Sequence, residues 1–203
     1  AGGLQARGVR RGDRVAVMMA NGVDVLVAYE AIWRAGAAIT PLMPALVEDE
    51  VAHILGGAEP AAVLVSAGTA DVVRAARATV GGTFPLAGDG GDVPWAELDA
   101  EPAPVVHDDG DLAAVLFTGG TTGRSKGVML THRNLTAAAA MAATADDARP
   151  DDVSLATLPL SHGFGLIAFL VTYLRPLRLL IRPRFDPDDF AATAEAEGVT
   201  VAD

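Results

Sequence analysis

The sequence predicts an α/β fold, in which a parallel or mixed β-sheet is covered by helices on both of its faces. Short runs of apolar and β-branched residues alternate along the chain with alanine-rich segments of helical period. The strand-like runs are almost continuously apolar, which is typical of strands buried between two layers of helices. With 51% apolar residues among 203, the chain has enough material for one well-buried core.

The predicted elements follow one another in a regular order. Seven runs read as strands: RVAVMM (14–19), AAITPLM (37–43), AAVLVS (61–66), LAAVLFT (112–118), VSLATLP (153–159), LRLLIRP (177–183) and VTVAD (199–203). Helical segments fall between most of them, over residues 23–34, 48–55, 70–79, 135–145, 164–174 and 187–197. The apolar run at 164–174 is much shorter than the roughly 20 residues that a bilayer requires, so it predicts a buried helix.

Two segments rich in Gly, Pro and Asp interrupt this alternation. Residues 81–111 predict a surface connection that contains one short turn around Trp95. The second cluster, ADDARPDD at 145–152, is the better candidate for a boundary between two modules. We therefore expect a first α/β subdomain over residues 1–148 and the start of a second over 149–203.

Charge and cysteine content narrow the classes of function. The 15 Lys and Arg against 26 Asp and Glu give a net charge of −11, which argues against nucleic acid as a partner. An anionic ligand would have to be attracted by local amides and a few chosen cations. The absence of cysteine excludes disulfides and thiolate ligands and fits a cytoplasmic location. The opening residues contain no basic-then-apolar leader, and we expect no secretion signal.

The segment FTGGTTGRSKGV (117–128) carries the clearest chemical signal. It follows a predicted strand that ends at Thr118 and precedes a helix that Thr131 can cap. Glycines allow successive backbone N–H groups to point inward, four hydroxyl groups add donors, and Lys126 adds a point charge. The segment is predicted to hold a di- or triphosphate. Its spacing matches neither the Walker loop nor the dinucleotide-binding fingerprint, and the alternative is an ordinary surface turn.

Residues 118–127 resemble the phosphate-binding signature T-S-G-T-T-G-x-P-K-G of the adenylate-forming enzymes, the AMP-dependent synthetase/ligase superfamily. Other segments occur in the family's order: GVRRGDRVAV, AYEAIWRAGAAITP, THRN, LPLSHGFG, FDP and GVT. Gly119 stands where the family usually has serine, a variant typical of fatty acyl-CoA ligases. Ser125 replaces the usual proline, which frees the backbone dihedral φ and adds a donor.

The resemblance implies that the protein joins a carboxylic acid, here a fatty acid, to AMP and passes the acyl group to coenzyme A. ATP, Mg²⁺ and coenzyme A are the implied cofactors and co-substrates. The implied ATP-binding residues are Thr118, Gly119, Gly120, Thr121, Thr122, Gly123, Ser125, Lys126 and Gly127. Lys126 and His162 are the implied catalytic residues, and His162, Phe164 and Gly165 the implied acyl-substrate pocket.

The other histidines give no comparable signal. A lone histidine in an apolar run is usually a core residue, and only its family context gives His162 a site role. His53, His107 and His132 have no i, i+4 spacing, so no metal site is predicted. We expect them to be surface or capping residues.

The resemblance also implies that the chain is an N-terminal fragment. Family members continue with a Y-G-x-T-E segment, a ribose-binding aspartate and a C-terminal lysine, which are absent here. We expect the fragment alone to be catalytically inactive, and its open sheet edges favour self-association. Two other functions stay open: a small nucleotide-binding or regulatory module without catalysis, and an amino-acid adenylation domain.

Overall fold

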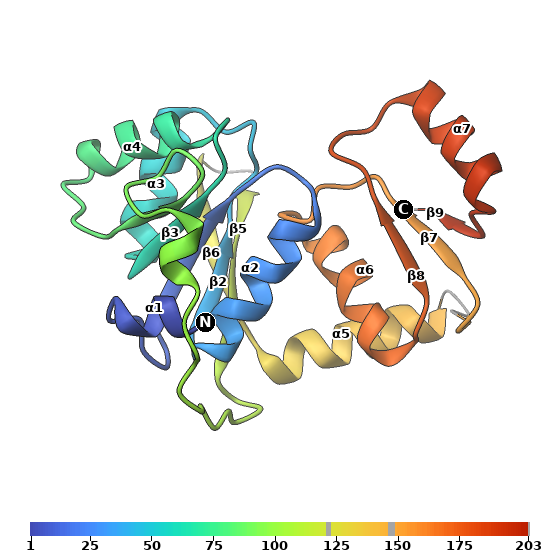
Figure 1. Cartoon of the computed structure of the whole chain (residues 1–203), viewed down its shortest axis with the longest axis horizontal. Coiled ribbons are helices and arrows are strands. Elements are labelled where there is room, and N and C mark those ends of the chain that lie inside the picture. Colours follow the sequence, from blue (N-terminus) through green and yellow to red (C-terminus); the bar gives the residue numbers. More distant parts are fainter. Residues whose placement is uncertain (121–122, 146–148, 203) are drawn as a thin grey trace. The chain divides into compact units, whose positions relative to one another are not determined.

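The computed structural model describes residues 1–120, 123–145 and 149–202, and it contains two compact units (Figure 1). The first unit consists of Ala1–Ala20 and Val27–His132, and the second of Asn21–Leu26 and Arg133–Asp203. The domain boundary predicted at residue 148 falls outside the described residues and stays a prediction.

Strands and helices alternate along most of the first unit, which ends with two consecutive strands. In chain order they are α1 (Gly2–Ala6), β1 (Arg14–Met18), α2 (Val23–Arg34, whose first turn belongs to the second unit), β2 (Ala38–Pro41), α3 (Glu48–Ala58), β3 (Ala62–Val65), α4 (Ala70–Thr79), β4 (Leu86–Gly88), the 3-10 helix η1 (Trp95–Leu98), β5 (Leu112–Gly120) and β6 (Gly123–Thr131). They form a six-stranded sheet in the order β4-β3-β1-β2-β5-β6, parallel except for β6.

The strand order places helices on both faces of this sheet. The chain moves from β1 through α2 to β2 in one direction, and from β2 through α3 to β3 in the other. Because such crossovers are right-handed, α2 covers one face, and α3 and α4 cover the opposite face. Apolar residues of α3 and α4 accordingly form one cluster with alternate residues of β1 and β3, such as Met18 and Val63. On the α2 face, Trp33 donates its indole N–H to the Ala113 carbonyl at 2.9 Å.

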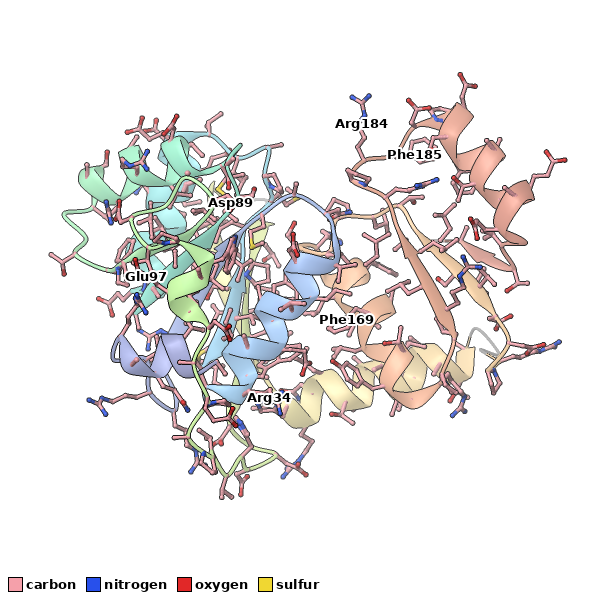
Figure 2. All side chains as sticks on the ribbon, in the orientation of Figure 1. Arg34, Asp89, Glu97, Phe169, Arg184 and Phe185 are labelled. Atoms are coloured by element: carbon pink, nitrogen blue, oxygen red, sulfur yellow. The ribbon has the colours of Figure 1, made fainter. Side chains whose placement is uncertain are left out.

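Polar contacts fasten the N-terminal helix of this unit. Arg7, the C-cap residue of α1, forms an ion pair with Glu97 of η1 at 2.7 Å, and Figure 2 labels Glu97. The backbone of α1 also approaches η1 closely, since a Cβ at Gly3 would lie 2.2 Å from the Leu98 Cα. The connection between β4 and β5 is therefore attached to the body of the unit at η1.

The second unit contains a small parallel sheet in the order β8-β7-β9. Its elements are α5 (His132–Ala145, whose first residue belongs to the first unit), β7 (Val153–Ala156), α6 (Gly163–Leu174), β8 (Arg178–Ile181), α7 (Pro187–Glu197) and β9 (Val201–Ala202). Local signals set the ends of α7. Asp186 accepts hydrogen bonds from the Asp188 and Asp189 amides, and Gly198 ends the helix in the left-handed region at φ 64°.

The predicted α/β class is confirmed, and each predicted strand and helix is present, with ends that match the prediction or differ from it by a few residues. The short turn around Trp95 is the 3-10 helix η1. Three elements were not predicted: α1, β4 and β6. In the described ranges, the helices are all too short or too polar to cross a bilayer.

Candidate functional site

The glycine-rich segment forms the end of a β-hairpin between β5 and β6. The two strands pair antiparallel from Leu112 opposite Thr131 to Gly120 opposite Gly123. The sequence interpretation of a strand, a glycine loop and then a helix is therefore wrong. Nine residues of strand β6 separate the turn from α5, so the dipole of that helix does not act at the turn.

The two faces of the hairpin have different surroundings. Phe117 packs against the α3 and α4 cluster, and its ring fits between two glycines. A Cβ at Gly57 of α3 would lie 3.3 Å from the Phe117 Cζ, and a Cβ at Gly127 would lie 3.2 Å from the same atom. Gly127 therefore gives the aromatic ring its space, a packing role beside the predicted phosphate-binding one.

Lys126 lies on the other face, directly opposite Thr118 in the ladder. Paired residues of antiparallel strands project to the same side, so the ammonium and the hydroxyl group are neighbours. Both residues are exposed, as is Gly119. Towards the residues that the structure describes, Lys126 forms no ion pair and no side-chain hydrogen bond. The ladder thus presents two donors to solvent at one position.

Lys126 is also the single lysine in the sequence; the other 14 basic residues are arginines. The chain therefore uses arginine wherever it needs an ordinary surface cation. A lysine differs from arginine in carrying a compact point charge with three rotatable donors, which suits phosphate oxygens approached from several directions.

His53 of α3 fastens the same arm of the hairpin, a role that sequence reasoning missed. Its Nε2 lies 2.8 Å from the Ser125 carbonyl oxygen, and because a carbonyl only accepts, Nε2 carries the proton. The His53 ring also contacts the Phe117 ring edge to face, with centroids 6.4 Å apart. The imidazole therefore holds the backbone next to Lys126. A separation of 72 residues leaves no local signal for this contact.

The base of the hairpin is fixed by an ion pair. The guanidinium of Arg11 donates to both carboxylate oxygens of Asp111, at 2.9 and 2.8 Å. This hydrogen bonding lowers the pKa of Asp111 to about 2. Asp111 also accepts from the Asp108 amide at 3.0 Å. The predicted loop connection therefore ends in a fixed carboxylate where β5 begins.

Two histidines distant in sequence lie together beside this base. The rings of His107 and His132 have centroids 5.1 Å apart, and His132 also contacts the Trp33 ring. Burial lowers the pKa of His132, and the neighbouring His107 lowers it further. Sequence spacing gave no sign of this pair. Across the described residues, no group of three or more His, Asp or Glu side chains is placed to hold a metal ion.

In the second unit, His162 is the N-cap of α6. Its Nδ1 accepts from the Phe164 amide at 3.3 Å, and its carbonyl accepts the first helical hydrogen bond, from Leu166 at 3.0 Å. An Nδ1 that accepts leaves the proton of the neutral ring on Nε2. The exposed imidazole can therefore donate from Nε2 to an anionic oxygen.

The three predicted acyl-pocket residues have different environments. The His162 and Phe164 rings are parallel to within 6° with centroids 6.2 Å apart, and Phe164 is 72% exposed. Gly165 is buried, and a Cβ there would lie 2.4 Å from the Pro159 carbonyl oxygen, so this position serves close packing. Further along α6, Phe169 (Figure 2) is buried and contacts Tyr173.

Of the predicted ATP-binding residues, Thr118, Gly119, Ser125, Lys126 and Gly127 lie on the hairpin. Gly120 and Gly123 are its last paired residues. Thr121 and Thr122 lie outside the described residues.

Comparisons with known proteins give a consistent result. The family model described as "AMP-binding enzyme" matches residues 1–203. A feruloyl-CoA synthase of an Amycolatopsis species is 34% identical over 205 residues, covering 99% of this chain and 40% of the synthase. A long-chain-fatty-acid–CoA ligase of Mycobacterium tuberculosis is 32% identical over 196 residues, covering 90% of this chain and 37% of the ligase.

Among solved structures, ATP-bound MatB from Rhodopseudomonas palustris superimposes with a TM-score of 0.84 and 36% identity. The match covers 98% of this chain and 40% of MatB. The chain therefore spans about two fifths of the length of the proteins it resembles.

Proposed function

Since the chain belongs to the AMP-binding enzyme family, we propose that the protein carrying it joins a carboxylic acid to AMP and then to coenzyme A. The relatives at 34% and 32% identity are by name a CoA synthase and a CoA ligase, which supports an acid–thiol ligase. Because the chain covers only 40% of the first of these relatives, the complete activity belongs to a longer protein.

The first step brings two anions together. A carboxylate oxygen attacks the α-phosphorus of ATP, the bond from that phosphorus to the bridging oxygen breaks, and pyrophosphate leaves with the electron pair. Positive charge at the β- and γ-phosphates stabilises the leaving group. Lys126 and Thr118 supply an ammonium and a hydroxyl donor from one face of the hairpin. Mg²⁺ enters with ATP as part of that substrate.

His162 is proposed to act on the carboxylate side. With Nδ1 engaged by the Phe164 amide, Nε2 donates to a carboxylate or phosphate oxygen and orients it. In the second step the thiol of coenzyme A loses its proton to solvent, its sulfur attacks the acyl carbonyl, the acyl–phosphate bond breaks, and AMP leaves. The exposed Phe164 ring beside His162 supplies apolar surface for the acyl chain.

One observation carries the proposal: the single lysine of the chain is exposed opposite Thr118 at the glycine-rich end of the hairpin. We expect Lys126→Ala in the full-length protein to lower kcat for acyl-adenylate formation by roughly 100-fold or more, as when one transition-state donor is removed. ATP–pyrophosphate exchange measures this step. Arg124→Ala, which removes an exposed cation two residues away on the same strand, is the matched control for charge alone and should change the rate by less than about threefold, because solvent screens exposed charges.

The 203-residue chain offers a second measurement. An amine-selective reagent can modify only Lys126 and the α-amino group of Ala1. Inorganic tripolyphosphate should slow labelling of Lys126 and leave labelling of Ala1 unchanged. The proposal would lose its basis if tripolyphosphate left the labelling rate of each amine unchanged and Lys126→Ala kept full activity.

The acyl group is proposed to be a fatty acid, from the glycine at position 119 and the fatty-acid ligase among the relatives. A feruloyl-CoA synthase is slightly more similar, at 34% identity against 32%, so the test compares decanoate and palmitate with ferulate in the full-length protein. If kcat/KM is higher for ferulate than for the two fatty acids, the proposed substrate is an aromatic acid and not a fatty acid. The isolated chain is expected to form no acyl-AMP, because it spans only part of its relatives.

A further inference from the structure

Asn21 contacts the segment that leads to His162. It lies between β1 and α2, and its carboxamide makes two hydrogen bonds within the second unit. The Asn21 Nδ2 donates to the Leu158 carbonyl at 3.1 Å, and the Asn21 Oδ1 accepts from the Leu160 amide at 2.9 Å. The side chain thus pairs with this backbone as a neighbouring strand would.

The bonded residues connect directly to the start of α6. Leu160 is fully buried, which fixes the backbone on the far side of the carboxamide contact. Between Leu158 and Leu160, the Pro159 carbonyl accepts from the His162 amide at 2.8 Å. The same carbonyl approaches Gly165 so closely that a Cβ there would lie 2.4 Å away. The backbone position of His162 therefore depends on a turn that the Asn21 side chain holds.

We propose that Asn21 is a positioning residue for His162. It does not touch the reacting groups; it fixes the Leu158–Leu160 backbone and through it the imidazole. This inference rests on the proposed function, because it assigns Asn21 a role in the same reaction. Asparagine suits the role because one planar group both donates and accepts, whereas the carboxylate of aspartate offers no donor for the Leu158 carbonyl.

The test uses the full-length protein with Asn21→Ala and Asn21→Asp. Both variants should lower kcat/KM for the carboxylic acid by roughly 10- to 100-fold, as expected when a reacting group is displaced by about 1 Å. Their KM for ATP should change by less than about twofold, because the hairpin that carries Lys126 is untouched. Val23→Ala, two residues away and 66% exposed, is the matched control and should leave both constants unchanged.

A double-mutant cycle with His162→Ala distinguishes positioning from general stability. If Asn21 acts through the imidazole, Asn21→Ala should change the rate by less than about threefold once His162 is absent. An undiminished loss in the His162→Ala background would overturn the inference, as would full activity of His162→Ala alone. If Asn21→Ala does not fold, the same cycle is run with Asn21→Asp, which preserves size and one hydrogen bond.

These outcomes separate the two proposals. Suppose that Lys126→Ala loses pyrophosphate exchange while the effects of Asn21→Ala and His162→Ala are additive. The proposal of carboxylate activation then stands, and only the positioning role of Asn21 is removed. Full exchange activity in Lys126→Ala removes the proposed function itself.

Discussion

Lys126 and His162 occupy two different kinds of local structure. Lys126 lies in an edge strand, and its position follows from the register of the ladder and from the hydrogen bond between His53 and Ser125. His162 lies at a helix start, in a turn with a buried leucine, a close glycine and the Asn21 carboxamide. The hairpin exposes the Lys126 side chain at little structural cost, whereas the turn cannot be altered without moving the backbone.

The largest effect on stability is expected when one glycine from each region is replaced by alanine. Gly165→Ala places a Cβ 2.4 Å from the Pro159 carbonyl oxygen, whereas a Cβ at Gly119 meets nothing within 4 Å. We expect Gly165→Ala to lower the free energy of unfolding by roughly 1–3 kcal/mol, and Gly119→Ala to change it by less than about 1 kcal/mol. Urea unfolding measures both. Equal losses would mean that the hairpin end is packed as closely as the turn.

A smaller effect is expected at the attachment of the hairpin to α3. His53→Phe preserves a ring against Phe117 but leaves the Ser125 carbonyl without its donor, at a cost of about 1 kcal/mol. KM for ATP should rise more than KM for the acid, since the backbone beside Lys126 loses a restraint. His53→Gln, which offers an amide donor, should restore part of the lost stability and reverse part of the rise in KM for ATP. Unchanged constants in His53→Phe would show that the ladder alone positions Lys126.

The ion pair between Arg11 and Asp111, at the start of β5, is expected to contribute less stability at low pH. The folded pKa of Asp111, about 2, lies below its ordinary value of 3.8. The stabilisation by Arg11 is therefore complete above about pH 4 and is lost as the pH falls from 4 towards 2. Asp111→Asn should flatten the decline in stability over that window, as followed by thermal unfolding. Because the pair is open to solvent, high salt should reduce the difference.

The smallest effect is expected for the stability of Lys126→Ala. The exposed side chain makes no ion pair with the described residues, so the free energy of unfolding should change by less than about 0.5 kcal/mol. A loss of activity without a loss of stability is the result that separates the two regions. A clear destabilisation would mean that Lys126 helps to hold the hairpin.

The buried strands could be predicted from the sequence because a strand covered on both faces is apolar along its whole length. The helices could be predicted because their segments have a helical period. Strand β6 has no such pattern: GRSKGVMLT is polar and glycine-rich at its start, and Met129 is 73% exposed at the sheet edge. Glycines that predicted a loop instead continue the ladder to Gly120. The predicted sequence of a strand, a glycine loop and a helix around the phosphate site was therefore the part that failed.

Contacts between distant residues are the part of the candidate site that no local pattern reveals. Asn21 and Leu158 are 137 residues apart, and His53 and Ser125 are 72 apart. Each contact uses a common side chain and a backbone group, which carry no spacing signal. The motif identified the residues proposed to meet ATP and the acid, and the structure added those that support them.

The second unit takes in residues 21–26 from the early part of the chain, which has a consequence for biosynthesis. Asn21 leaves the ribosome 137 residues before Leu158, a delay of roughly 7–27 s at ordinary translation rates of about 5–20 residues per second. The amino-terminal strands can associate in that interval, but the turn at Leu158–Leu160 can only mature afterwards. Proteolytic separation near residue 132 would deprive the later fragment of a carboxamide that it cannot replace.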